Sequence, residues 1–172
     1  MVAILDRRET AVWAALAEVT DPEIPTIGLV DLGVIGGFSF GARAGGGQRL
    51  TVDLLPTFVG CPAIEVMRER IGQRLTALGV ADEVVVEVSF AEPWTSERIT
   101  PAGRDALRRS GFAPPATRSF GDGDLLTMLP SATCPYCGSH RTALENAFGP
   151  TLCRAIYHCA DCRQPFEAFK EV

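Results

Sequence analysis

Two pairs of cysteines near the C-terminus constrain this chain more than any other feature of its sequence. The residues are Cys134 and Cys137, then Cys159 and Cys162, with two residues inside each pair and 21 between the pairs. One tight turn can aim both thiolates of a pair at a single ion, so two such turns supply a closed tetrahedral site. The gap between the pairs is one residue longer than is usual for this pattern. We therefore predict a structural zinc ribbon over residues 133–172.

Other interpretations of the same segment remain open from the residues alone. Iron suits four thiolates as well as zinc does, and the pairs could instead be disulfides or redox pairs. Cys153 or His158 could replace one ligand, and His140 follows the first pair closely. We interpret these three residues as packed or bystander side chains. The segment has few large apolar residues, so we expect bound metal to contribute much of its folding free energy.

The composition of the chain argues against several classes of function. The formal net charge is -5, whereas a general nucleic-acid partner calls for a positive field. No uncharged apolar run approaches the roughly 20 residues that cross a bilayer, and the N-terminal basic residues follow the apolar ones, the reverse of a secretory signal. Both histidines lie in the cysteine-rich segment, which leaves no obvious base for hydrolytic catalysis. We expect a cytoplasmic protein, not itself catalytic, that binds neither nucleic acid nor membrane.

The residues before the cysteine pairs predict a small α+β domain. Apolar positions recur at helical spacing in residues 8–19 and 63–78, and three segments alternate as strands. The strands expected are residues 34–40, 50–55 and 84–90. The order α-β-β-α-β describes a sheet with one face covered by helices.

A further short helix is expected after this domain's last strand. Thr100 is a suitable N-cap and Pro101 suits the first helical position, with the end near Ser110. The following segment has little periodicity and several Pro and Gly residues. We therefore assign residues 1–111 to the α+β domain, 112–132 to a linker and 133–172 to the ribbon.

Cys61 is the one cysteine outside the C-terminal segment. It stands between Gly60 and Pro62, which predicts that it is the N-cap of the 63–78 helix. There the helix dipole would stabilise its thiolate, which could bind a soft metal or attack an electrophile. The same residues equally suit a small buried side chain filling a turn. Asp21 and Glu23, in a proline-rich turn, could flank a metal or polarise the thiol, or could be solvated or capping groups.

Several segments taken together resemble the metal–sulfur cluster biosynthesis domain of SufT-like proteins. They are DPEIP at 21–25, VDLG at 30–33 and PTFVGCPA at 56–63. The motif PWT at 93–95, the two cysteine pairs, FGPT at 148–151 and PFEAFK at 165–170 narrow the resemblance. They are similar to the PaaD (also PaaJ) family of accessory subunits in bacterial phenylacetyl-CoA epoxidase systems. The resemblance runs from about residue 13 to residue 170.

The resemblance implies an accessory role in aerobic phenylacetate catabolism, beside a di-iron oxygenase and a reductase that carries flavin and a 2Fe–2S cluster. It implies that Cys61 transiently holds iron or an iron–sulfur cluster, with Asp21 and Glu23 beside it, and that oxygenase or reductase subunits are the partners. One thiolate cannot secure a cluster, so a second protomer, a small thiol or the recipient must supply further ligands. This need for shared ligands favours a homodimer.

Two other functions remain open from the sequence. The chain could be a purely structural adaptor of the epoxidase complex, with the ribbon as the docking module and Cys61 as packing. It could also be a thiol oxidoreductase, if the sulfurs of Cys61 and Cys153 meet. Direct hydroxylase activity is not expected, because the chain lacks the Glu-x-x-His pairs of a di-iron helical bundle.

Overall fold

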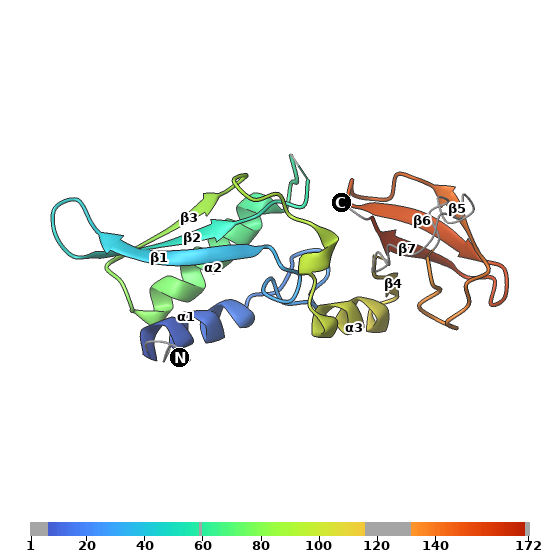
Figure 1. Cartoon of the computed structure of the whole chain (residues 1–172), viewed down its shortest axis with the longest axis horizontal. Helices are drawn as coiled ribbons and strands as arrows, with labels where there is room; N and C mark the ends of the chain where they lie inside the picture. The colour runs from blue at the N-terminus through green and yellow to red at the C-terminus, as the bar shows by residue number, and fades with distance from the viewer. Residues whose placement is uncertain (1–6, 59, 116–131, 171–172) are drawn as a thin grey trace, which may run out of the picture. The chain divides into compact units, whose positions relative to one another are not determined.

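The computed structural model describes residues 7–58, 60–115 and 132–170, and the chain divides into two compact units (Figure 1). The first unit is Met1–Trp94 and the second is Thr95–Val172. Each unit is described by itself below. Within the described ranges, no helix combines the length and the apolar character that a membrane crossing requires.

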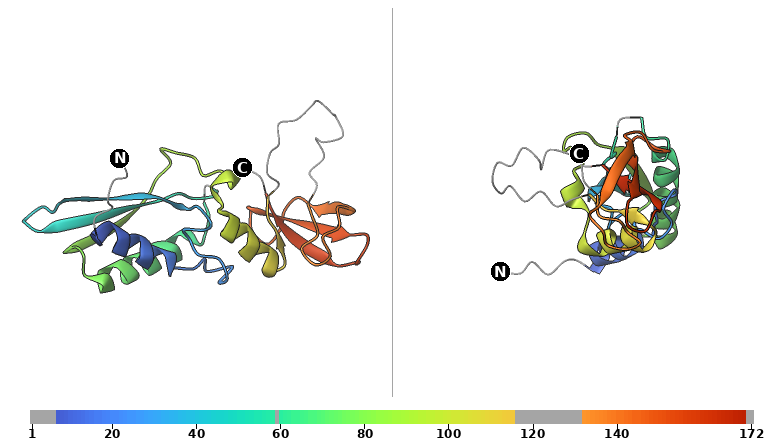
Figure 2. Two further views of the ribbon diagram at one scale, coloured as in Figure 1. Left: turned by 60° about the horizontal axis from the view of Figure 1, so that its bottom comes forward. Right: turned by 90° about the vertical axis from the view of Figure 1, so that its right-hand side faces the viewer.

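The first unit is a three-stranded sheet with two helices on one face (Figure 2). Strand β2 lies in the centre, antiparallel to β1 and parallel to β3. In chain order the elements are α1 (Arg7–Ala17), β1 (Ile35–Ala42), β2 (Gln48–Leu54), α2 (Ile64–Leu78) and β3 (Glu83–Val88). The predicted order α-β-β-α-β and the helix-covered sheet are therefore confirmed.

The core of this unit lies between the sheet and the two helices. Leu50, Val52 and Leu54 alternate along β2 and are fully buried. Ile71 and Leu75 of α2 lie one turn apart and are fully buried as well. Each such side chain stabilises the fold by about 1.5–3 kcal/mol relative to its exposed state. This burial anchors the end of β2 and the start of α2, between which the Cys61 turn is held.

The second unit contains a short helical region and a four-stranded sheet in the order β4-β7-β6-β5. Helix α3 begins as expected, because the Thr100 side chain accepts a hydrogen bond from the Gly103 N–H at 3.0 Å and Pro101 follows it. The elements are η1 (Ser96–Arg98), α3 (Pro101–Arg109), β4 (Phe112–Ala113), β5 (Thr142–Asn146), β6 (Arg154–Cys159) and β7 (Pro165–Phe169).

The boundary between the units differs from the sequence-based assignment. Compactness divides the chain after Trp94 rather than after residue 111, so α3 lies in the ribbon's unit. Phe112 and Ala113, assigned to the linker from sequence, form β4 and pair in parallel with Glu167 and Ala168 of β7. Two residues are too few to show a strand period, so only the pairing reveals them. The remaining assigned linker residues, 116–131, lie outside the described residues.

Candidate metal centre and the Cys61 turn

The structure brings the four predicted ligands together at one end of the ribbon. The Sγ atoms of Cys134, Cys137, Cys159 and Cys162 all lie within 4.8 Å of one another. Within the described parts of the chain, this is the one group of three or more His, Cys, Asp or Glu residues arranged to hold a metal. It contains neither of the histidines nor Cys153. A ring of four sulfurs at this spacing is what a tetrahedral thiolate site requires.

The two knuckles have the same backbone geometry. In the first, the Cys134 N–H donates to the Ser139 carbonyl and the Gly138 N–H donates back to the Cys134 carbonyl, both at 2.9 Å. In the second, Cys159 and Gln164 are joined at 3.0 Å, and the Arg163 N–H donates to the Cys159 carbonyl at 2.9 Å. The fourth residue after the first cysteine has a positive φ in both, 74° at Gly138 and 60° at Arg163.

The sulfurs lie among backbone N–H groups that favour thiolate. The Cys162 N–H lowers the pKa of Cys159 to about 6, against the opposing effect of burial. The Ser139 N–H likewise lowers the pKa of Cys137, but burial and the neighbouring sulfurs together raise it to about 12. The pKa of Cys162 is also raised: the Gln164 N–H lowers it, but burial and nearby sulfurs outweigh that effect. Four crowded thiols cannot all ionise alone, so this donor set fits a divalent cation.

Residues of the short strand β4 and of the first knuckle support the ribbon. Arg154 is buried, forms an ion pair with Glu167 at 2.9 Å, and lies 5.2 Å from the centre of the Phe112 ring. The Tyr136 hydroxyl approaches the α-carbon region of Gly111, where a Cβ would meet it at 3.0 Å. Sequence reasoning missed these contacts, because a lone Arg beside strand residues gives no signal of burial.

Cys61 lies one turn before α2 rather than at its N-cap. Ala63 is the N-cap residue, and the first helical bond runs from the Met67 N–H to the Ala63 carbonyl at 2.9 Å. The Cys61 carbonyl instead accepts from the Ile64 N–H at 3.3 Å, after a left-handed Gly60 with φ 81°. The predicted N-cap position is therefore wrong by two residues, because Pro62 and Ala63 form a turn before the helix begins. The Cys61 residue is half-buried.

The acidic turn shows what holds one of its two carboxylates. Asp21 is only 7% exposed, and its Oδ1 accepts the N–H groups of Glu23 and Ile24 at 2.8 Å each. This is a side chain capping its own turn. Glu23 is exposed. Among the described residues, Cys61, Asp21 and Glu23 do not form a three-ligand group.

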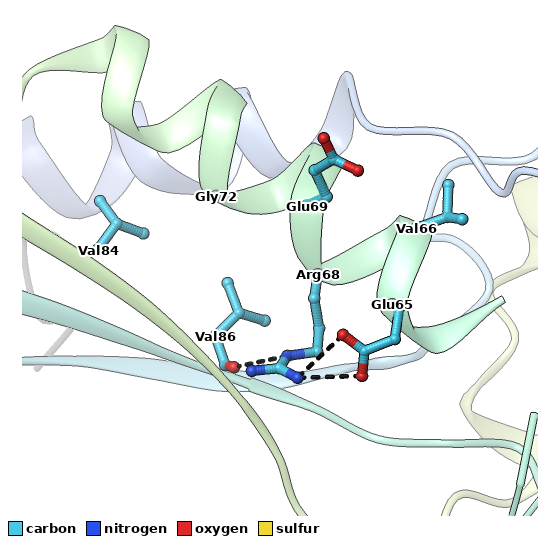
Figure 3. Close-up of a pocket in the computed structure, with 7 residues that line it drawn as sticks. All are labelled: Glu65, Val66, Arg68, Glu69, Gly72, Val84 and Val86. Carbon is cyan, nitrogen blue, oxygen red and sulfur yellow. Dashed lines mark hydrogen bonds and ion pairs between the residues drawn. The ribbon is translucent and has the colours of Figure 1, made fainter. Parts of the chain in front are cut away.

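A shallow hollow of about 440 Å³ lies between α2 and the outer edge of β3 (Figure 3). Its lining residues are Glu65, Val66, Arg68, Glu69, Gly72, Val84 and Val86. The Arg68 guanidinium donates to the Val86 carbonyl at 3.2 Å and pairs with Glu65 at 3.1 Å. The side chain therefore already caps the edge of β3, and no site residue predicted from sequence lines this hollow.

Trp94 serves packing rather than forming an open platform. It is buried, and its Nε1–H donates to the Leu32 carbonyl at 3.1 Å. This bond ties the end of the first unit to the loop that carries Gly33, a residue with φ 73°. The motifs at 30–33 and 93–95 are thus joined by one buried hydrogen bond.

Comparisons with known proteins match both units. Residues 9–90 match a family described as "Iron-sulfur cluster assembly protein", and residues 124–170 match one described as "PaaD zinc beta ribbon domain". A crystal structure of a "Domain of Unknown Function DUF59" from Bacillus anthracis covers 58% of this chain and 91% of its own, at 26% identity and a TM-score of 0.50. A solution structure from Mycobacterium tuberculosis, named as associated with Fe–S complex assembly and repair, covers 65% and 95% at 29% identity and a TM-score of 0.39.

One curated relative matches nearly the whole chain. It is an Escherichia coli protein whose name, "Putative 1,2-phenylacetyl-CoA epoxidase", is qualified as one subunit of that enzyme. The two are 36% identical over 160 residues, which are 92% of this chain and 90% of the relative. The match spans both units and includes the four-cysteine centre. The chain therefore belongs to the PaaD family, in which an iron–sulfur cluster assembly domain precedes a zinc ribbon.

Proposed function

We propose that this chain is a cytoplasmic accessory subunit of a phenylacetyl-CoA epoxidase system, and that it assists assembly or repair of an iron or iron–sulfur centre through Cys61. The observation that carries the proposal is that residues 9–90, which match the cluster-assembly family, contain a single cysteine. That thiol is half-buried in a glycine-led turn between a buried strand and a helix. A carrier with one ligand must share its cargo with the recipient, which suits transfer better than storage.

The acidic turn has two different roles in this proposal. Asp21 holds the turn in shape through its bonds to the Glu23 and Ile24 N–H groups. Glu23 is the exposed carboxylate and so the better placed to contact iron carried into the site. The recipient, a small thiol or a second protomer of a homodimer supplies the other ligands.

We assign zinc to the ribbon, as a structural ion. The support is the closed set of four sulfurs and the match to a zinc ribbon family. Zinc holds four thiolates without redox change, so the centre would fix the two knuckles and take no part in cargo transfer. Epoxidase oxygenase or reductase subunits are the proposed recipients.

The test is metal and acid-labile sulfide content per chain after anaerobic purification, together with iron loading of the recipient. We expect Cys61→Ser to retain one zinc and to lose the iron, the sulfide and the ability to restore iron to a depleted oxygenase or reductase. Cys153→Ser is the matched control, since Cys153 is half-buried and lies outside the four-cysteine centre. Recipient iron loading by Cys61→Ser equal to that by wild type would overturn the proposal.

A structural adaptor is the second candidate, and one observation favours it. Among the described residues, the side chains of Cys61, Asp21 and Glu23 do not converge on a metal position. An adaptor would stay bound to the epoxidase in fixed stoichiometry, whereas a maturation factor would dissociate once the recipient is loaded. Sedimentation of the purified mixture before and after iron loading separates the two.

A further inference from the structure

We propose that residues 147–153, the loop between β5 and β6, form the surface by which this chain docks onto an epoxidase subunit. The occupant we commit to is an apolar pocket of that subunit with carboxylates at its rim. The partner's identity rests on the proposed function, whereas the surface and its chemistry rest on the ribbon alone. We call residues 147–153 the β5–β6 loop.

The β5–β6 loop presents two large apolar side chains to solvent. Phe148 is 67% exposed and Leu152 is 54% exposed. They stand four residues apart, on a sheet whose other large side chains, Tyr157 and Phe166, are buried and stacked. Exposed aromatic and aliphatic side chains on a short segment are characteristic anchors of protein interfaces.

The backbone of this loop is held in place although its apolar side chains are exposed. The Phe148 N–H donates to Asn146 Oδ1 and the Gly149 N–H to the Arg154 carbonyl, each at 2.9 Å. The Arg154 N–H donates to the Thr151 carbonyl at 3.1 Å. Gly149 also packs so closely on Arg154 that a Cβ would lie 3.0 Å from that residue's Cβ. A preorganised loop loses little entropy on binding, which favours its use as an anchor.

A positive charge accompanies the aromatic anchor. The Lys170 Nζ lies 4.9 Å from the centre of the Phe148 ring, and the Lys170 N–H donates to the Cys153 carbonyl at 2.9 Å. A partner pocket that receives the ring would therefore meet this ammonium at its rim, where a carboxylate complements it. A two-fold contact between two copies through so small a loop would bring two Lys170 side chains near each other, which disfavours a second copy as occupant.

The α2–β3 hollow is the weaker docking candidate. A strand added at the edge of β3 would have to displace the Arg68 side chain from the Val86 carbonyl and from Glu65 (Figure 3). The β5–β6 loop requires no such displacement.

The test is the dissociation constant of the full-length, zinc-loaded chain with the epoxidase oxygenase component and, separately, with the reductase component. We expect Phe148→Ser and Leu152→Ser each to weaken binding to one component by at least about tenfold, and Lys170→Glu to weaken it and reduce its salt dependence. Phe90→Ser is the matched control, because Phe90 is 62% exposed but lies in the first unit. Its binding should stay within about twofold of wild type.

The other outcomes overturn specific parts of the proposal. Unchanged binding by both loop variants would remove the docking surface and leave the role of Cys61 intact. Unchanged binding by Lys170→Glu would remove the acidic rim. If the loop variants dissociate a dimer of this chain, or lower its melting temperature without affecting either component, the occupant is a second copy or the chain itself. If wild type binds neither component, both the docking surface and the proposed epoxidase partner fail.

Discussion

At the scale of single residues, the knuckles show how two different side chains meet one backbone demand. Gly138 and Arg163 occupy equivalent positions with φ of 74° and 60°. Glycine adopts this conformation without strain, whereas an L-residue with a Cβ is disfavoured there. The second knuckle keeps its shape because Cys159 is bonded to both Arg163 and Gln164. Arg163 therefore stores a small strain that the bound metal can hold.

This equivalence predicts opposite effects for two substitutions. Gly138→Ala should destabilise the zinc-loaded ribbon by about 1 kcal/mol through backbone strain alone, because no atom lies within 4 Å of its added Cβ. Arg163→Gly should stabilise it by a similar or smaller amount, about 0.5–1 kcal/mol. Chemical denaturation monitored on the second unit measures both. Equal effects of the same sign would contradict the equivalence of the two positions.

At the scale of elements, the two-residue strand β4 closes one edge of the ribbon sheet. Ala113 is fully buried and pairs with Ala168, while the Phe112 ring lies beside the Arg154 guanidinium. The core around it is small and includes Ala155, Tyr157 and the ligands Cys134 and Cys159. A core made largely of alanines and metal ligands has little apolar area to lose, so each contact of β4 matters.

We therefore predict that Ala113→Asp unfolds or severely loosens the second unit. Burying an unpaired carboxylate costs several kcal/mol, which exceeds what a small metal-stabilised sheet can absorb. Ala143→Asp is the matched control, because Ala143 lies in β5 of the same sheet and is exposed. Zinc content and amide exchange in β5–β7 report the result. Ribbon protection equal in the two variants would mean that β4 is dispensable.

At the scale of the whole molecule, the two units are stabilised by different means. The first has a core of large aliphatic side chains contributed by the sheet, α1 and α2, and none of the four metal ligands lies in it. The second depends on a metal centre whose buried ligands, Cys134 and Cys159, are part of its core. Metal binding and folding are thus coupled in one unit and independent in the other.

Metal removal should therefore unfold one unit and spare the other. After chelation under reducing conditions, we expect amide protection to collapse in β5, β6 and β7 and to persist in β2 and α2. Restoring zinc should restore the ribbon. Loss of protection in both units together would show that the first unit depends on the metal centre.

Local patterns of residues were enough to predict most elements and the metal ligands. Cysteine spacing indicated the four ligands, because two residues between ligands is a local turn geometry that needs no distant contact. Helical and alternating apolar periods likewise predicted the first unit, since Leu50, Val52 and Leu54 alternate whatever they pack against.

What distant residues do together became visible only in the folded chain. β4 exists because β7 pairs with it, and Arg154 is buried because Glu167 and Phe112 meet it. The start of α2 depends on a turn through Pro62, which places Cys61 two residues before the N-cap. These outcomes follow from long-range pairing and packing, whose energies depend on partners that no local pattern of residues records.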